Sequence, residues 1–221
     1  MLARLVRRRR GVLAERDLVR ARLRVVMPAR AERGRSGLVV PAKPRRKIAP
    51  VRIAEALDEA IDLARPLGAQ RHIAIEKDLG NCAGQYVLAD RQRLLQVLLN
   101  LLSNATKYNR YGGSVNLSCE LRSPDMVRIG ISDTGPGIAR HAQARLFTPF
   151  ERLTAAESGI EGAGLGLAVS KTLVEAMGGS IGVETVAGRG STFWIDLRAT
   201  PTPEEELEFE ATTRQHTETL Q

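Results

Sequence analysis

The chain has few of the residues that build disulfide-linked or membrane-embedded proteins. It contains only two cysteines, Cys82 and Cys119, in 221 residues, and they have neither CxxC nor metal-ligand spacing. Because two cysteines are too few for a disulfide scaffold, we expect a reduced, cytoplasmic protein. The longest apolar run, LLQVLLNLL, has nine residues and includes two polar ones, whereas a membrane-spanning helix needs ~20 apolar residues. The sequence therefore predicts no membrane span.

Aromatic residues are also scarce, at 4%, and the net charge of +8 is unevenly distributed along the chain. Residues 1–50 contain 16 Lys and Arg against 3 Asp and Glu, residues 51–198 contain 16 of each kind, and residues 199–221 contain 1 against 6. We therefore predict a basic arm and linker, a neutral folded domain and an acidic, disordered tail over these three ranges. The arm has a weak helical pattern but no aromatic side chain for base stacking, so nucleic acid is not favoured as its partner.

Apolar periodicity within the neutral domain predicts alternating helices and strands. Helical spacing predicts helices over 53–64, which Pro66 and Gly68 would end, over 91–109 after the capping residue Asp90, and over 167–177. Alternation predicts strands over 72–76, 85–89, 114–121, 126–133, 180–186 and 191–197. The segment from Pro28 to Pro50 is rich in Pro, Gly and Arg and is interpreted as a linker.

The helix after Asp90 carries an unusual polar face. Asn100 and Asn104 lie one turn apart in a leucine-rich sequence, and Lys107 follows almost one turn later. A solvated face would more naturally use Glu or Lys, because Asn is a poor helix former. An amide oxygen suits Mg²⁺, and a lysine suits phosphates. By itself this NxxxN spacing is common, so a ligand site and an ordinary solvated face are both open interpretations.

Three glycine-rich turns follow. Asp133-Thr134-Gly135-Pro136-Gly137 ends a strand, and alternation places the Asp133 carboxylate on the buried face, where a purine amine could donate to it; a plain Asx turn is the alternative. Residues 162–166, Gly-Ala-Gly-Leu-Gly, precede a helix whose N-terminus could bind phosphate, or they form only a junction. Residues 188–192, Gly-Arg-Gly-Ser-Thr, are on their own most simply a hairpin.

Taken in order, these features resemble a known family. Asn100 with Asn104, residues 133–137, residues 147–152, residues 162–166 and residues 188–192 are similar to the N, G1, F, G2 and G3 boxes of sensor histidine kinases. The similarity covers roughly residues 48–198. It implies a two-layer α/β sandwich, in which helices cover one face of a mixed, mostly antiparallel sheet and a mobile ATP lid closes the site.

The resemblance also implies roles for single residues. Asn104 would coordinate a Mg²⁺ ion that bridges the ATP phosphates, supported by Asn100, while Lys107 would contact the phosphates and Tyr108 would border the nucleotide. Asp133 would accept a hydrogen bond from the adenine amine. The remaining contacts implied are close approach to the base at Gly135 and Gly137, lid anchoring by Phe147 and Phe150, a γ-phosphate contact from Arg152, phosphate contacts at Gly162, Gly164, Leu165 and Gly166, and an adenine contact from Thr192.

Two features define the activity that this resemblance implies. Topoisomerase, mismatch-repair, chaperone and anti-sigma relatives typically have a Glu that acts as a general base where this chain has Asn100. An amide cannot take a proton in this way. The three histidines, His72, His141 and His216, lack the HExxxP-like motif of a phosphoacceptor. We therefore expect an ATP-dependent protein-histidine kinase module that is inactive alone. It would phosphorylate a histidine-containing dimerisation domain or a kinase partner in trans, with a response regulator downstream. The alternative is a non-catalytic nucleotide-binding module or a degenerate kinase fragment.

Overall fold

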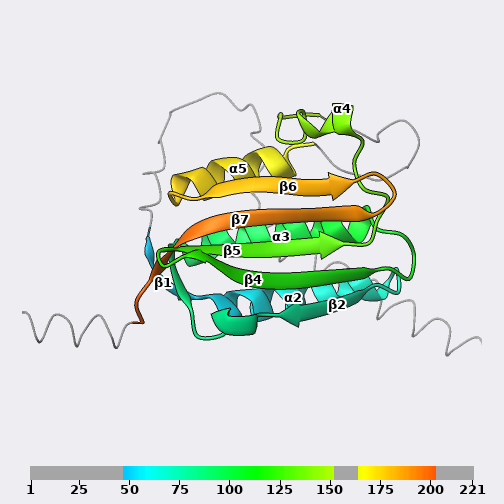
Figure 1. Ribbon diagram of the computed structural model, residues 1–221. Helices are drawn as coiled ribbons and strands as arrows, with labels where there is room; N and C mark the ends of the chain where they lie inside the picture. The colour runs from blue at the N-terminus through cyan, green and yellow to red at the C-terminus, as the bar shows by residue number, and fades with distance from the viewer. Residues whose placement is uncertain (1–46, 152–163, 203–221) are drawn as a thin grey trace, which may run out of the picture. The chain divides into compact units, whose positions relative to one another are not determined.

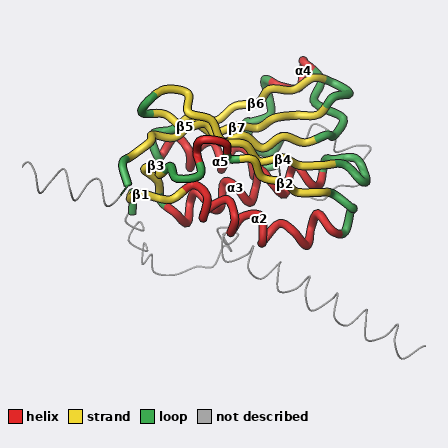
Figure 2. The backbone as a smooth tube through the Cα atoms, turned by 60° about the horizontal axis from the view of Figure 1, so that its bottom comes forward, coloured by secondary structure: helices red, strands yellow, loops and turns green. Residues whose placement is uncertain are grey.

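The computed structural model describes residues 47–151 and 164–202 of the chain. In these residues seven strands form one sheet in the order β1-β3-β7-β5-β4-β2, with β6 paired to β7, and the longer helices cover one face of it (Figure 1). The turned view separates the sheet from this helical layer (Figure 2). The β2–β4 pair is parallel and the other pairs are antiparallel. The predicted two-layer α/β fold with a mixed, mostly antiparallel sheet is confirmed.

The bounds of the elements follow the predicted pattern closely in the centre of the chain. The strands are β1 (Ala49–Arg52), β2 (Ala74–Asp78), β3 (Tyr86–Ala89), β4 (Ser114–Ser123), β5 (Met126–Asp133), β6 (Ser180–Val186) and β7 (Gly190–Thr200). The helices are α2 (Ile53–Ala69), α3 (Arg91–Lys107), α4 (Arg140–Gln143) and α5 (Gly166–Ala176), with a short 3-10 turn, η1 (Gly80–Cys82). Thus β5 and β6 have the predicted bounds.

The core lies between the helices and the covered face of the sheet. Alternate residues of β5 and β7 point into it, α3 packs against β5, and α2 packs against α3 and β2. Its largest fully buried side chains include Ile53, Leu57, Leu94, Leu98, Leu102, Ile129, Ile131, Ile195 and Leu197. Burying each such side chain stabilises the fold by about 1.5–3 kcal/mol. The packed helices and strands therefore form a rigid support for the polar residues that they carry.

The structure differs from the sequence predictions at the ends of several elements. β7 continues to Thr200, two residues into the range predicted as a disordered tail, because Ala199 and Thr200 pair with β3. β1 begins with the last two residues of the segment interpreted as a linker and pairs with β3 at the edge of the sheet, a position where a proline is tolerated. Helix α2 runs past Pro66 to Ala69, because a proline in the last turn leaves only the carbonyl of the exposed Asp62 without its helical donor. β2 begins at Ala74 rather than at His72, whose φ of 55° is incompatible with a strand.

Several predictions fall on residues outside the described ranges. These include the structure of the arm up to residue 46, the acidic tail from residue 203, and most of the expected lid, residues 152–163. The division into arm, domain and tail therefore stays a prediction.

Candidate functional site

Helix α3 begins as the sequence predicts. The carboxylate of Asp90 accepts hydrogen bonds from the backbone N–H groups of Gln92, at 3.1 Å, and Arg93, at 3.2 Å, and so satisfies two of the donors that a helix start leaves free. The cap fixes the residue at which α3 begins. The leucines then fill the core, and the opposite side carries the polar residues towards α5.

Asn100 connects α3 to the start of α5. Its amide nitrogen donates to the hydroxyl of the buried Ser170 at 2.9 Å. A Cβ at Gly166 would lie only 2.2 Å from the amide oxygen of Asn100, so only glycine permits this approach of the two helices. Asn100 is therefore held in place by α5, and its amide nitrogen is hydrogen-bonded to Ser170.

The last turn of α3 presents polar groups that have no partner in residues 47–151 and 164–202. Asn104 is half-buried, and within the described residues its amide makes no hydrogen bond. Lys107 is exposed and forms no ion pair in the part of the chain that the structure describes. Tyr108, at the C-cap, is 42% exposed. An amide oxygen, an ammonium group and a phenol ring are thus available to a ligand within little more than one helical turn.

Asp133 ends β5 on the face that the helices cover. Its carboxylate accepts the backbone N–H of Gly135 at 2.8 Å, and the backbone N–H of Ser191 in the paired strand lies near it. Burial raises the pKa of this carboxyl, and the two N–H groups lower it by less. The predicted Asx turn is therefore present, and the carboxylate keeps acceptor capacity for a further donor, because an ionised carboxylate has about four lone-pair sites.

The loop after Asp133 is fixed on both sides. Gly135 is buried against the end of α3, where a Cβ would lie 2.8 Å from the carbonyl oxygen of Tyr108. Gly137 has a φ of +67°, and a Cβ there would lie 2.1 Å from the carbonyl oxygen of Val186 in the β6–β7 hairpin. The loop is therefore positioned between α3 and this hairpin, which brings residues 133–137 to the end of α3 that carries Lys107 and Tyr108.

The structure does not bring Thr192 to this site. Thr192 pairs with Ser132, and their hydroxyl groups are 2.8 Å apart on the face of the sheet away from the helices. Ser191 instead pairs with Asp133, is buried, and has its hydroxyl 2.9 Å from that of Thr185. We therefore replace Thr192 by Ser191 in the candidate site. Strand parity is the sequence signal that could have found it, because Phe193 and the alternate residues after it form core.

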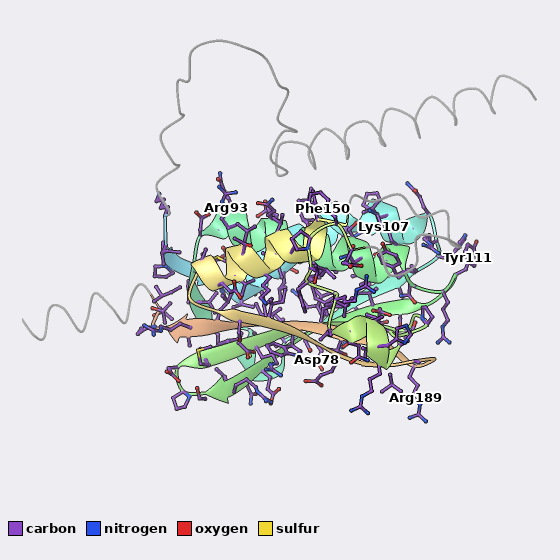
Figure 3. All side chains as sticks on the ribbon, turned by 90° about the horizontal axis from the view of Figure 1, so that it is seen from above. Asp78, Arg93, Lys107, Tyr111, Phe150 and Arg189 are labelled. Atoms are coloured by element: carbon purple, nitrogen blue, oxygen red, sulfur yellow. The ribbon has the colours of Figure 1, made fainter. Side chains whose placement is uncertain are left out.

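The described residues on either side of the segment 152–163 meet beside the start of α5. The backbone N–H of Phe150 donates to the carbonyl oxygen of Gly164 at 2.9 Å, and Arg145 forms an ion pair with Glu151 at 2.5 Å. Phe150 is 74% exposed and has a φ of 65°, whereas Phe147 is half-buried. Figure 3 shows Phe150 and Lys107 on the helical side of the sheet. The predicted site residues Arg152 and Gly162 lie outside the described residues.

The start of α5 completes the candidate site. Gly164 and Leu165 precede Gly166, its first residue, and no side chain of the described residues caps the helix. The first N–H groups of α5 therefore have no capping acceptor from a side chain, next to the Asn100 and Asn104 face of α3. A helix N-terminus of this kind favours anions such as phosphate.

Neither histidine in the described residues lies on a helical hairpin. The His72 ring stacks at a tilt on Tyr111, with 4.9 Å between the ring centroids, and His141 is exposed in the short helix α4. His216 lies outside the described residues. Among residues 47–151 and 164–202, no helix has the length and apolar character to cross a bilayer.

Comparison with protein families and relatives agrees with this arrangement. The family model described as histidine kinase-, DNA gyrase B- and HSP90-like ATPase matches residues 89–201. The adaptive-response sensory kinase SasA of Synechococcus sp. (strain CC9311) is 41% identical over 111 residues, which cover 50% of this chain and 29% of SasA. The circadian input-output histidine kinase CikA of Synechococcus elongatus (strain ATCC 33912 / PCC 7942 / FACHB-805) is 47% identical over 110 residues, which cover 48% of this chain and 14% of CikA.

Solved structures give the same result. Full-length ShkA in complex with AMPPNP superposes with a TM-score of 0.64 and 36% identity, over 72% of this chain and 33% of ShkA. The mycobacterial sensor histidine kinase MprB gives a TM-score of 0.60 and 28% identity, over 70% of this chain and 99% of the MprB chain. The match thus spans a minor part of the full-length relatives and nearly all of the MprB chain.

Proposed function

Because the chain belongs to the histidine kinase-, DNA gyrase B- and HSP90-like ATPase family, and its folded body is the ATP-binding domain of a sensor histidine kinase, we propose that it transfers the γ-phosphoryl group of ATP to a histidine. The acceptor would be on a histidine-containing dimerisation domain supplied in trans, and a response regulator would receive the group later. The observation that carries this proposal is Asn100, an amide already bonded to Ser170. An amide cannot deprotonate water or a hydroxyl, whereas a neutral imidazole acceptor is itself nucleophilic.

The adenine end of the nucleotide is assigned to the loop after β5. The remaining acceptor capacity of Asp133 suits the exocyclic amine of adenine, which has two N–H donors. Ser191 lies beside Asp133 in the adjacent strand, and the close packing of Gly135 and Gly137 keeps the loop backbone near the base. Tyr108 would border the nucleotide from the end of α3.

The phosphates are assigned to α3 and the start of α5. Lys107 supplies a positive charge that forms no ion pair with the described residues, and the N–H groups from Gly164 to Gly166 supply donors. The residues also fit Mg²⁺, because Asn104 has a hard, neutral amide oxygen that no described protein group occupies. Bound there, Mg²⁺ would neutralise phosphate charge. Arg152 and Gly162 keep their predicted roles at the γ-phosphate and at the other phosphates.

The proposed reaction needs little covalent chemistry from the protein. The acceptor imidazole nitrogen attacks the γ-phosphorus, the bond from the γ-phosphorus to the bridging oxygen breaks, and ADP leaves. Lys107, Arg152 and the N–H groups of α5 would stabilise the negative charge that spreads over the transferred group. Asn100 would hold α3 and α5 at the separation that places these groups on one phosphate chain.

Phosphotransfer in trans tests this function. We expect that γ-labelled ATP and Mg²⁺ leave the purified chain unlabelled, and that adding a separately purified dimerisation hairpin gives acid-labile label on the hairpin. A hairpin with its acceptor histidine replaced by glutamine is the matched control and should stay unlabelled. Acid-labile label on the chain alone would contradict transfer in trans. ATP binding without transfer to any of several hairpins would favour the non-catalytic nucleotide-binding module.

A further inference from the structure

A buried asparagine directly after α3 connects the two halves of the site. Asn109 is 4% exposed and follows the C-cap Tyr108. Its amide nitrogen donates to the carbonyl oxygen of Ser114 at 2.9 Å, and its amide oxygen accepts the hydroxyl of Thr134 at 3.2 Å. One side chain therefore joins the end of α3 to the start of β4 and to the loop after β5.

Thr134 closes the same network from the other side. Its hydroxyl oxygen accepts the backbone N–H of Ser114 at 2.9 Å, and its own backbone N–H donates to the Ser114 carbonyl oxygen at 3.2 Å. The Thr134 hydroxyl thus both accepts and donates, and the Asn109 amide oxygen also accepts the N–H of Arg110 at 2.9 Å. This partly buried network, with its members bonded around the buried Asn109, favours a single geometry, because a shift would leave the Asn109 amide without a partner.

Close packing removes the remaining freedom of the loop. A Cβ at Gly135 would lie 3.3 Å from the Cα of Asn109, and a Cβ at Gly113 would lie 2.7 Å from the Thr134 hydroxyl oxygen. Thr134 stands between Asp133 and Gly135 in the chain. Its position therefore sets where the Asp133 carboxylate lies relative to α3, which carries Asn104 and Lys107.

We infer that Asn109 and Thr134 are a positioning pair that sets the selectivity of the site for adenine over guanine. This inference rests on the proposed function, because it assumes that Asp133 meets the base. Adenine presents an amine to Asp133, whereas guanine presents a carbonyl oxygen at the same ring position, which a carboxylate repels. That discrimination needs a carboxylate held within hydrogen-bond distance of one place, and a loop released from α3 would lose it.

The test measures dissociation constants for ATP and GTP, with Mg²⁺, by isothermal titration calorimetry. Thr134→Val removes the hydroxyl at nearly constant shape, and we expect ATP affinity to fall about 10-fold while GTP affinity changes by less than about 2-fold. Thr134→Ser keeps the hydroxyl and should keep the wild-type ratio of the two constants. Ser132→Ala is the matched control, since it removes a hydroxyl contact on the opposite face of the sheet and should leave the ratio unchanged.

The outcomes separate positioning from a purely structural role. If Thr134→Val lowers the free energy of unfolding but leaves the ATP to GTP ratio unchanged, the positioning role is refuted. If the substituted chain does not fold, Thr134→Ala repeats the test, because a smaller residue admits water to the Ser114 N–H; unfolding of both variants also refutes the inference. A wild-type chain that binds neither nucleotide would instead refute the proposed function.

Discussion

The Asp133→Asn substitution tests the site by removing a carboxylate whose ionised form is destabilised by burial. Burial raises the pKa of this carboxyl, so the folded chain binds the proton more tightly than the unfolded chain does. The free energy of unfolding therefore falls as pH rises from the ordinary carboxyl pKa to the raised one, and stays low above it. The variant has no such titration. We expect the stability of Asp133→Asn relative to wild type to increase with pH across this window and then to level off.

Although Asp133→Asn should raise the relative stability, it should lower the affinity for ATP. An amide oxygen can still accept the N–H of Gly135, at 2.8 Å in the wild type, but the amide nitrogen cannot accept the adenine amine. A hydrogen bond to a charged group contributes about 1.5–3 kcal/mol, so ATP affinity should fall about 10- to 100-fold, with GTP much less affected. Wild-type ATP affinity should also decrease as pH falls through the raised pKa, because protonation removes the charge, and the variant should lack that decrease.

Urea unfolding over a pH series, together with calorimetric titration of ATP and GTP, measures both effects. Asp125→Asn is the matched control at the exposed β4–β5 turn, where the hydrogen bond from Ser123 lowers the pKa of the carboxyl. Stability from Asp125 is present above its ordinary pKa and lost as pH falls, so its variant should show the opposite slope and normal nucleotide binding. Equal losses of ATP and GTP affinity in Asp133→Asn, or a falling relative stability with pH, would refute the reasoning.

Three further substitutions or reactions examine other parts of the described fold. Asn104→Ala should remove the Mg²⁺ dependence of ATP binding while the free energy of unfolding, measured in urea, changes by less than about 0.5 kcal/mol, since the amide has no described partner; unchanged Mg²⁺ dependence would contradict the metal assignment. Gly166→Ala should destabilise the fold by about 1–3 kcal/mol in the same assay, because the added Cβ would lie 2.2 Å from the Asn100 amide oxygen, whereas helix propensity alone predicts a gain. Burial and the contact with Cys82 raise the pKa of the Cys119 thiol, so iodoacetamide at about pH 8 should modify it slowly until the chain unfolds; rapid labelling of the folded chain, seen by mass spectrometry, would count against this.

The sequence was sufficient to predict elements in which the apolar pattern and the capping or turn residues at the ends agree. β5 alternates apolar and other residues up to Asp133 and starts after a turn, so its bounds could be predicted. The start of α3 after the capping Asp90 could be predicted in the same way, although the helix ends at Lys107 and not at Asn109. β1 could not be predicted, because four residues that include Pro50 carry no alternation, and only pairing with β3 makes them a strand. Tertiary contacts decide short edge strands, and a local pattern does not contain them.

The candidate site shows a different limit. The order of the motifs could indicate which segments come together, and the segments within the described residues do lie together. It could not indicate which polar atoms lack a hydrogen-bond partner. Asn100 and Asn104 are identical residues one turn apart, and both were expected to serve the ligand. The structure distinguishes them, because Ser170 of α5 lies opposite only the first, so Asn100 has a partner and Asn104 has none among the described residues. The family pattern also predicted Thr192 as a site residue, whereas the alternation of side chains along β7 places Ser191 on the side of Asp133. In both cases the missing information is which neighbour each side chain faces, and that depends on how distant segments pack.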